Sequence, residues 1–396
     1  MKTIILISPF PPVQNPRLLK EYQVLKANGF TVKVWYAERD KWAANYNDNK
    51  NADFKLIGGR YGSVFYYFTR LIHKILKNIL PKALGLNRVS WLLYLKAFTQ
   101  KADLYIAHNS AALPITVKAA QWHNAKCGFD AEDFHRQETT DNQGSQHYKT
   151  VKYLEDKYFP KLNYLTAASP LIAKWHKELY PSLNPIVINN VFSSKHIVLN
   201  DSLSDDKTLN LFWFSQTIGK HRGIEDAIVA MGILKNTNIK LNLLGLINPS
   251  EKVYFKTCAN QSGLELNQLI FLEPVQPDNI FTIASKFDIG LALEINTPFN
   301  RDICLTNKLF TYLTAGLAIV ASETSAQKQF MDAHPSVGKS YRIGDTDGLA
   351  KIIDFYFHNR RSLMQSKKAA LDLARNELNW EIESKKFITL VKTTVQ

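Results

Sequence analysis

The chain has 396 residues, of which 45% are hydrophobic, 12% aromatic and 21% charged, and its formal net charge is +14. This is the composition of an ordinary globular protein, and the length predicts two domains. Three widely separated cysteines match no metal-ligand spacing, which favours reduced thiols in a cytosolic protein. No apolar run reaches the ~18–20 residues that span a bilayer, and the N-terminal MKTIILISPF is typical of a first strand and not of a signal peptide.

Strands alternate with helix-length segments through the first half of the chain. The strands are expected at 3–8, 31–36, 103–108, 126–130, 164–169 and 185–190. Strands separated in this way form parallel sheets that are covered by helices. We therefore expect an N-terminal Rossmann-like domain over residues 1–190.

The positive charge is concentrated between Lys55 and Lys101, where nine Lys or Arg and no Asp or Glu occur. Within it, residues 63–80 have helical apolar spacing and a polar face made only of basic residues and a histidine. This segment is either a core-packed helix with a basic outer face or a helix that docks on an anionic membrane surface. No recognition motif supports a nucleic-acid partner. The basic residues and the histidine are Arg70, His73, Lys74 and Lys77.

Residues 191–208 are rich in Ser and Asp and lack periodicity, so we interpret them as a linker. Alternation then resumes over 209–375, with strands expected at 209–215, 240–245, 269–274, 288–293 and 317–322. A last helical region begins near residue 362, and residues 376–396 are expected to be a C-terminal helix that packs back on the first domain. The prediction is an α/β protein with two doubly wound, Rossmann-like domains.

Ligands of such sheets bind beyond the carboxyl ends of the strands, so the functional residues are expected in the loops there. After the strand at 209–215, Lys220, His221 and Arg222 precede a helix that opens near Gly223. A helix start and adjacent cations attract a diphosphate. The alternative is a solvated basic loop.

A second loop of this kind follows the strand at 288–293 and contains Glu294, Asn300 and Arg301. Thr306 is expected to cap the next helix, which places Asn307 and Lys308 in its first turn. A lysine there opposes the helix dipole unless an anion shares the site.

These loops also carry a resemblance to a family. The order of KxRG after the first strand of the second domain and NKLFTYLTAGLAIVAS late in it resembles the family 4 glycosyltransferases of the GT-B fold. SPFPPVQNPRLLKEYQVLKANGFTVKVWYAER, ADLYIAHNSAALP and YLTAASPLIAKWHKELY extend the resemblance over nearly the whole chain.

The resemblance implies two Rossmann-like domains that face a central cleft, with the sugar donor on the C-terminal domain and the acceptor on the N-terminal one. It implies a metal-independent, retaining transferase with no cofactor, whose donor substrate is a nucleotide-diphosphate sugar. Lys220, Arg222 and Gly223 would bind the donor diphosphate, whose charge develops as the glycosidic bond breaks.

The family's paired glutamates are missing here. Counting back from Gly316 places Thr311 and Ile303 at their positions. Glu294 is the candidate for contacting the ribose in their place. Arg301, Asn307, Lys308 and Thr311 complete the expected donor contacts.

The stretch FDAEDFHRQE (129–138) lies where relatives resemble DxHE. Glu132 and Asp133 are the candidate catalytic carboxylates, able to orient or deprotonate an acceptor hydroxyl, and His108 is a third candidate. Asp130 is expected to contact substrate, as are Asn15 and Arg17 of the first, proline-rich loop. The alternatives for this stretch are a solvated acidic loop or a divalent-ion site; we expect no metal.

The leading hypothesis is a glycosyltransferase that acts on a lipid-linked or cell-surface glycan precursor in polysaccharide biosynthesis. A cytoplasmic protein, peripheral at the inner face of the cell membrane, would suit the basic segment. Two alternatives stay open: a sugar-nucleotide epimerase or hydrolase, and a non-catalytic GT-B-like binding subunit.

Overall fold

The computed structural model describes residues 1–38, 51–77, 79, 83, 85–198 and 207–396. The chain divides into two compact units. Unit 1 contains Met1–Asn189 and Ser384–Gln396, and unit 2 contains Asn190–Glu383. Of the linker expected over 191–208, residues 199–206 lie outside the described residues, and Val191 is buried in the core of unit 2.

Unit 1 is built on a seven-stranded sheet in the order β3-β2-β1-β4-β5-β6-β7, and every pair is parallel. Its central strands are buried because both faces are covered, as in doubly wound folds. The strands are β1 (Thr3–Ile7), β2 (Thr31–Tyr36), β3 (Phe54–Leu56), β4 (Leu104–His108), β5 (Lys126–Ala131), β6 (Tyr164–Ala167) and β7 (Ile186–Val187).

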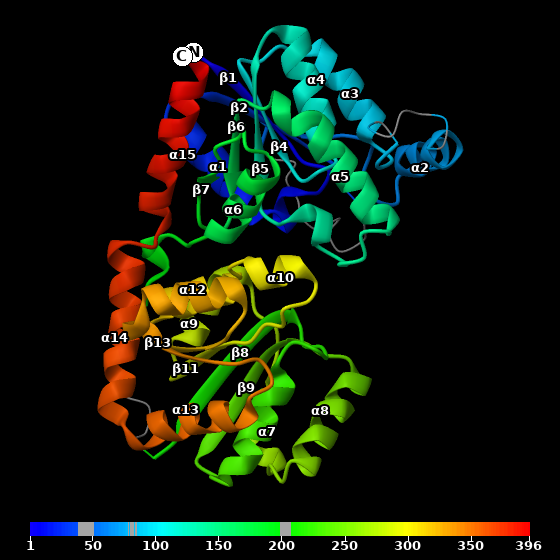
Figure 1. Ribbon diagram of the computed structural model, residues 1–396. Helices are drawn as coiled ribbons and strands as arrows, with labels where there is room; N and C mark the ends of the chain where they lie inside the picture. Colours follow the sequence, from blue (N-terminus) through cyan, green and yellow to red (C-terminus); the bar gives the residue numbers. More distant parts are fainter. Residues whose placement is uncertain (39–50, 78, 80–82, 84, 199–206) are drawn as a thin grey trace. The chain divides into compact units, whose positions relative to one another are not determined.

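The helices of unit 1 lie in two layers. Figure 1 shows α3, α4 and α5 on one face of the sheet and α1 and α15 on the other. His176 of α6 packs on Phe134 and Phe159, on the side of α5. Lys392 of α15 donates to Asn28 Oδ1, just after α1, at 3.2 Å. The helices are α1 (Pro16–Ala27), α2 (Val64–Leu76), α3 (Ser90–Thr99), α4 (Leu113–His123), α5 (Gln146–Tyr158), α6 (Pro170–Leu179) and α15 (Trp380–Val395), of which the residues from Ser384 belong to unit 1.

Unit 2 is built on a six-stranded sheet in the order β10-β9-β8-β11-β12-β13, again with parallel pairs throughout. The sheet reverses its direction of growth between β8 and β11, which is the switch point where such folds bind ligands. The strands are β8 (Leu209–Thr217), β9 (Ile239–Leu246), β10 (Leu269–Leu272), β11 (Ile289–Ala292), β12 (Ala318–Ser322) and β13 (Gly338–Tyr341).

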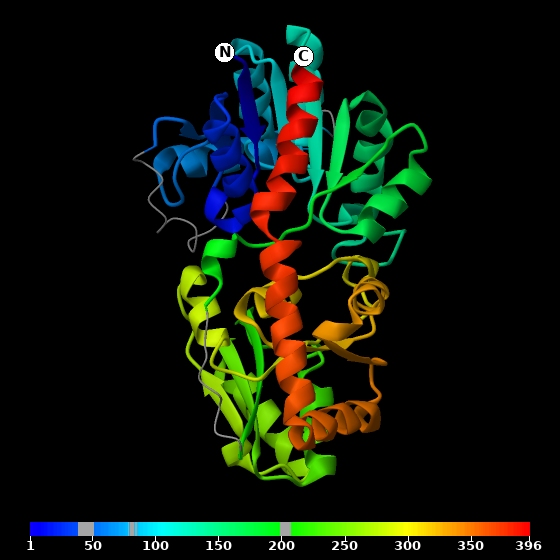
Figure 2. The ribbon, with the colours of Figure 1, turned by 90° about the vertical axis from the view of Figure 1, so that its left-hand side faces the viewer.

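Two buried cores cover the two faces of the unit 2 sheet, one under α7, α8 and α13 and the other under α9, α11 and α14. The long helix α14 packs on α11 and β12, as the turned view in Figure 2 shows. The helices are α7 (Ile224–Leu234), α8 (Pro249–Gln261), α9 (Ile280–Ala284), α10 (Phe299–Ile303), α11 (Asn307–Ala315), α12 (Ser325–Ala333), α13 (Thr346–His358) and α14 (Arg360–Asn376).

The predicted fold class is confirmed: the chain is α/β, with two parallel, Rossmann-like sheets. Two strands were not expected. β3 has only three residues and β13 is the largely polar GKSY, so neither has the apolar run that indicates a strand. In the part of the chain that the structure describes, no helix combines the length and apolarity that crossing a bilayer requires.

Candidate functional site

A cluster of charged side chains lies at the carboxyl ends of adjacent strands in unit 1. The parallel register pairs His108 of β4 with Asp130 of β5, and Asp130 with Thr166 of β6. Helix α1 follows β1, the neighbour of β4, and its first turns contribute Arg17, Lys20 and Glu21. The cluster therefore follows from the strand order.

Arg17 and Asp130 form a bidentate ion pair at the centre of the cluster. Arg17 Nε and Nη2 donate to the two oxygens of Asp130 at 2.5 and 2.7 Å, and Nη1 donates to the Ile188 carbonyl at 2.5 Å. Both side chains are 1% exposed. Burial would raise the pKa of Asp130, but Arg17 and His108 hold it below its usual value. Thr166 Oγ1 donates to Asp130 Oδ1 at 2.6 Å, so the carboxylate is fully engaged.

Three residues that are expected to contact substrate are engaged within the protein in this structure, and their roles as substrate contacts stay predictions. Arg17 and Asp130 are buried and hold each other. Asn15 is also buried, and its side chain caps α1 by accepting from Leu18 N at 2.9 Å. In this structure all three make hydrogen bonds inside unit 1 that stabilise the ends of the strands and the start of α1.

His108 is fully buried between carboxylates. Its Nε2 lies 3.2 Å from Glu21 Oε2, and its Nδ1 lies 3.5 Å from Glu132 Oε1 and 3.6 Å from Asp130 Oδ2. Burial opposes protonation, but Glu21, Glu132 and Asp130 together raise the pKa of His108 to about 10. The ring is thus an imidazolium at neutral pH. A protonated histidine does not accept a proton from a substrate, and the catalytic role expected for His108 stays a prediction.

Sequence reasoning missed Lys20 and Glu21 of this cluster. Burial and Asp130 raise the pKa of Glu21, and burial and Arg17 lower the pKa of Lys20 to about 7. The available signal was the four-residue spacing of Arg17 and Glu21 on the helix after the first strand, which places both on one face.

Glu132 connects the cluster to solvent. Its side chain is 28% exposed, whereas those of His108, Asp130 and Glu21 are at most 1% exposed. It follows β5 directly, at the strand end where ligands of this fold class bind. Asp133 is partly buried, and it contributes to the raised pKa of His135, whose main partner is Glu138 at 3.0 Å. Glu132 is therefore the carboxylate of the His108 cluster that is most exposed to solvent.

His108, Asp130 and Glu132 could offer a metal ion one ligand atom each, within 4.8 Å of one another. The chemistry of the trio opposes this reading. His108 must be neutral to bind a metal, and its pKa is about 10. Asp130 would have to leave Arg17. A cation inside the cluster would also be repelled by Arg17 and by the imidazolium.

The raised pKa of His108 predicts a pH-dependent stability. In an unfolded chain a histidine titrates near 6.5, so the folded state binds the extra proton between pH 6.5 and about 10. The stabilisation is complete below pH 6.5 and is lost as the pH rises toward 10. We expect the difference in free energy of unfolding between the wild type and H108N to fall by on the order of 3 kcal/mol between pH 6.5 and 9.

Urea unfolding at several pH values measures this difference. His135 titrates in both proteins, so its contribution cancels when the free energy of unfolding of H108N is subtracted from that of the wild type. Lys20 faces the cluster with a pKa of about 7, so K20M/H108N against K20M is the matched pair that removes its titration. A difference that stayed constant with pH would mean that His108 is neutral when folded.

In unit 2 the loops after β8 and β11 meet at the switch point. Gly223 has φ of 78°, and a Cβ at this position would lie 2.9 Å from Leu293 Cβ. Glycine is therefore required twice, by the positive φ and by the close approach. Ser322 of β12 donates to the Glu294 carbonyl and accepts from its amide, both at 2.8 Å, which fixes the start of the second loop.

Lys308 in the first turn of α11 pairs with Glu294 across this junction. The Nζ to Oε1 distance is 2.5 Å, both side chains are largely buried, and Nζ lies 5.4 Å from the ring centre of Trp213 on β8. The sequence predicts that a bound anion shares the start of this helix with Lys308. Glu294 supplies that negative charge, so the lysine alone does not require a ligand. Glu294 is correspondingly engaged and not free to bind ribose with both oxygens.

The other expected donor contacts are dispersed around the same strand ends. Lys220 Nζ lies 4.1 Å from the ring centre of Tyr254, and Arg222 Nη1 donates to Ser215 Oγ at 2.9 Å. Asn307 accepts from Asn190 at 3.0 Å. Arg301 is a partly buried residue of α10. Thr311 is buried within α11, where it is not positioned as a donor contact in this structure.

The positive end of the helix dipole has fewer acidic residues around it in the first turn of α11 than in the first turn of α7. Thr306 has the extended backbone of an N-cap, but its hydroxyl accepts no hydrogen bond from the helix, which corrects the expected cap. Its Oγ1 is buried without a hydrogen-bond partner among the described residues. The first turn of α11 contains no acid, whereas α7 begins with Glu225 and Asp226, and Glu225 accepts from His221 N at 3.0 Å. An anion is therefore better accommodated at α11.

The fold of the chain matches solved structures of the GT-B fold over nearly its whole length. HepE of Anabaena, determined with UDP, matches with a TM-score of 0.73 at 14% identity over 99% of this chain and all of that one. Sucrose-phosphate synthase of Thermosynechococcus elongatus gives a TM-score of 0.74 at 14% identity over 99% of both chains. TarM gives 0.68 at 9% identity over 98% of both. No protein-family model and no curated protein sequence matches the chain.

Proposed function

We propose that this protein is a glycosyltransferase that moves a sugar from a nucleotide-diphosphate donor to an acceptor hydroxyl, with retention of configuration. The fold match supports this over nearly the entire length, but one fold hosts several activities. The observation that carries the proposal is the junction of Gly223, Leu293, Glu294 and Lys308 beside the uncapped start of α11. It combines a close backbone approach, a cation and free helix N–H groups at a switch point.

The donor diphosphate binds at the amino end of α11, with Arg222 as one cation and Lys308 as the other once Lys308 exchanges Glu294 for the phosphate. Lys220 and Arg301 lie on the adjoining loop and helix. UDP is the first nucleotide to test, because HepE was determined with UDP and with UDP-glucose. The proposed acceptor is a hydroxyl of a lipid-linked or cell-surface glycan precursor, with Glu132 of unit 1 as the carboxylate that contacts it.

Thermal unfolding with millimolar UDP tests the donor site. A ligand at about a hundred times its dissociation constant stabilises by ~2.7 kcal/mol, enough for a shift of a few degrees. We expect R222A to weaken UDP binding by about 1.5–3 kcal/mol, the usual contribution of a hydrogen bond to a charged group. K256A, which changes an exposed lysine of α8, is the matched control and should bind UDP like the wild type.

A second variant separates ligand binding from folding. T306D places a carboxylate at the N-cap, where it accepts from the helix N–H groups and repels a phosphate. We expect unliganded T306D to be at least as stable as the wild type and to lose the shift with UDP. An unaltered UDP shift in both R222A and T306D would reject the donor site at α11, and no shift of the wild type with any nucleoside diphosphate would reject the proposed function.

A further inference from the structure

Helix α2 is attached to unit 1 by its polar side. Arg88 donates to Thr69 Oγ1 at 2.7 Å and to the Gly58 carbonyl at 2.6 Å, and its guanidinium lies 4.0 Å from the ring centre of Tyr66. Tyr66 and Thr69 are the buried residues of α2. A hydrogen-bonded arginine therefore holds the helix, and the apolar face is not needed for its attachment.

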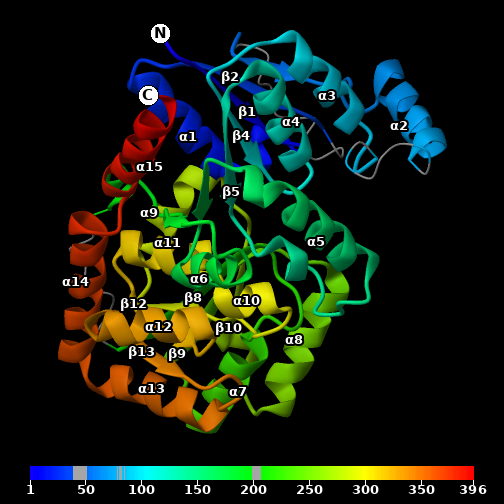
Figure 3. The same ribbon diagram turned by 45° about the horizontal axis from the view of Figure 1, so that its top comes forward.

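The apolar face of α2 points away from the unit. Val64, Phe68, Leu71 and Ile75 follow one another at spacings of four, three and four, so they form one stripe along the helix. Val64 is 88% exposed, Leu71 57% and Ile75 59%, and Ile79 beyond the helix end is 75% exposed. Figures 1 and 3 both show α2 at the periphery of unit 1, beyond α3. An amphipathic helix of a globular protein usually packs its apolar stripe against the core, whereas α2 exposes its stripe to solvent.

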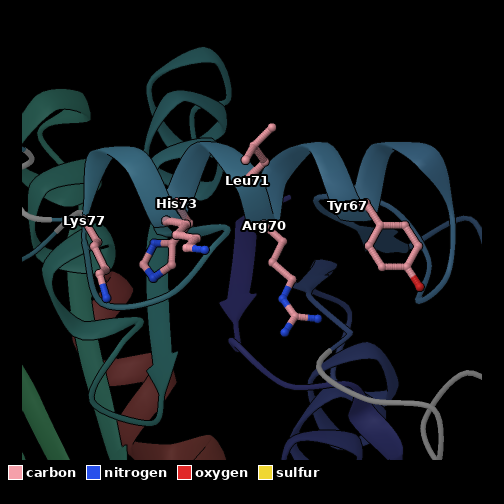
Figure 4. Close-up of a pocket in the computed structure, with 6 residues that line it drawn as sticks. Tyr67, Arg70, Leu71, His73 and Lys77 are labelled. Carbon is pink, nitrogen blue, oxygen red and sulfur yellow. The ribbon is translucent and has the colours of Figure 1, made fainter.

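A basic row lies on the side of the helix opposite the apolar stripe. Figure 4 shows Arg70, His73 and Lys77 on one side of the helix, with Leu71 pointing to the opposite side. Together with Tyr67, Leu71 and Lys74 they line an open groove of about 560 Å³. Burial and Lys77 lower the pKa of His73, so at neutral pH the charge comes from Arg70, Lys74 and Lys77. No acidic residue occurs between Lys55 and Lys101 to neutralise this charge.

We propose that α2 docks unit 1 on an anionic phospholipid surface, with its apolar stripe among the acyl chains and its basic row on the lipid phosphates. An exposed apolar face opposite a basic face is the pattern of an interfacial helix. The positive charge of the basic row distinguishes between two possible partners of α2, a second copy of the chain and an anionic membrane. A second copy would bring another basic row against the first, which is repulsive, whereas an anionic membrane attracts each row. The proposal is independent of the transferase activity.

Co-sedimentation of the full chain with vesicles tests the proposal. We expect binding to vesicles of phosphatidylcholine with phosphatidylglycerol and little binding to phosphatidylcholine alone. R70E/K74E/K77E should lower the partition coefficient for the anionic vesicles on the order of 100-fold or more, since each basic residue contributes about a factor of five. F68S/L71S/I75S should lower it also, with no change of charge. K256E/K351E/K368E, on exposed lysines of unit 2, is the matched control with the same change in net charge and should bind like the wild type.

Equal loss in the control and in the α2 charge variant would overturn the proposal, because overall charge would then explain binding. Undiminished binding of both α2 variants would overturn it too. Sedimentation velocity on the same proteins identifies the competing occupant. If F68S/L71S/I75S converts a dimer to a monomer and still binds anionic vesicles, the stripe is a self-association surface and the proposal is wrong. Hydrogen exchange of the β1, β4 and β5 amides would show that unit 1 of each α2 variant is folded.

Discussion

Replacing Arg17 by methionine is expected to lower the free energy of unfolding of unit 1 by about 3–5 kcal/mol. The substitution removes the cation between Asp130 and Glu21 and leaves the Asp130 carboxylate buried beside one histidine. It also leaves the Ile188 carbonyl without its donor. The cost arises mainly from the uncompensated charge, because methionine fills much of the same volume.

Hydrogen exchange of the β1, β4 and β5 amides in urea measures this loss for unit 1 separately from unit 2. K2M is the matched control, since Lys2 and Asp103 form an exposed ion pair at 3.3 Å whose loss should cost at most about 1 kcal/mol. In R17M/D130N the unpaired charge is gone, so we expect it to be more stable than R17M. A loss in R17M no greater than in K2M would contradict a buried, unsolvated pair.

The sequence predicts the fold well because its signals are local. Apolar runs separated by helix-length segments indicate parallel strands, and Gly29 and Gly316 mark where helices end. The helix at residues 63–80 was predicted by its periodicity. Which of its faces packs could not be predicted, because the anchor, Arg88, lies outside the helix and acts through its guanidinium.

The position of the candidate site could be predicted from the sequence, but the ion pairs within it could not. The rule that ligands bind at strand ends indicates Asp130, His108 and Arg17 together. That Arg17 and Asp130 neutralise each other depends on strand register and on the direction of α1, over a separation of 113 residues. The same applies to Lys308, whose partner Glu294 lies in the preceding loop. A charged residue at a strand end can pair with another side chain or bind a ligand. The sequence alone does not tell these cases apart, because the pairing partner lies elsewhere in the chain.

Substituting Glu132 by glutamine is expected to lower kcat by about 10²–10⁴-fold, the usual contribution of a general acid or base. Glutamine keeps the size and most of the hydrogen bonding of the side chain but removes the charge that accepts a proton or balances a developing positive charge. His108, 3.5 Å below Glu132, would lose one anionic neighbour and keep Glu21 and Asp130. The thermal shift with UDP should not change, because the proposed donor site is built entirely from unit 2.

Release of UDP from UDP-glucose, with water as the acceptor, measures kcat without knowledge of the natural acceptor. D133N is the matched control: it removes a neighbouring carboxylate from the same loop, and we expect less than a tenfold effect. If D133N were the inactive variant and E132Q the active one, the catalytic role would belong to Asp133. If both released UDP like the wild type, the acidic stretch after β5 would only shape the strand end. The exposure of Glu132 above a buried imidazolium favours the first result, since it is the carboxylate of the cluster that a substrate can reach.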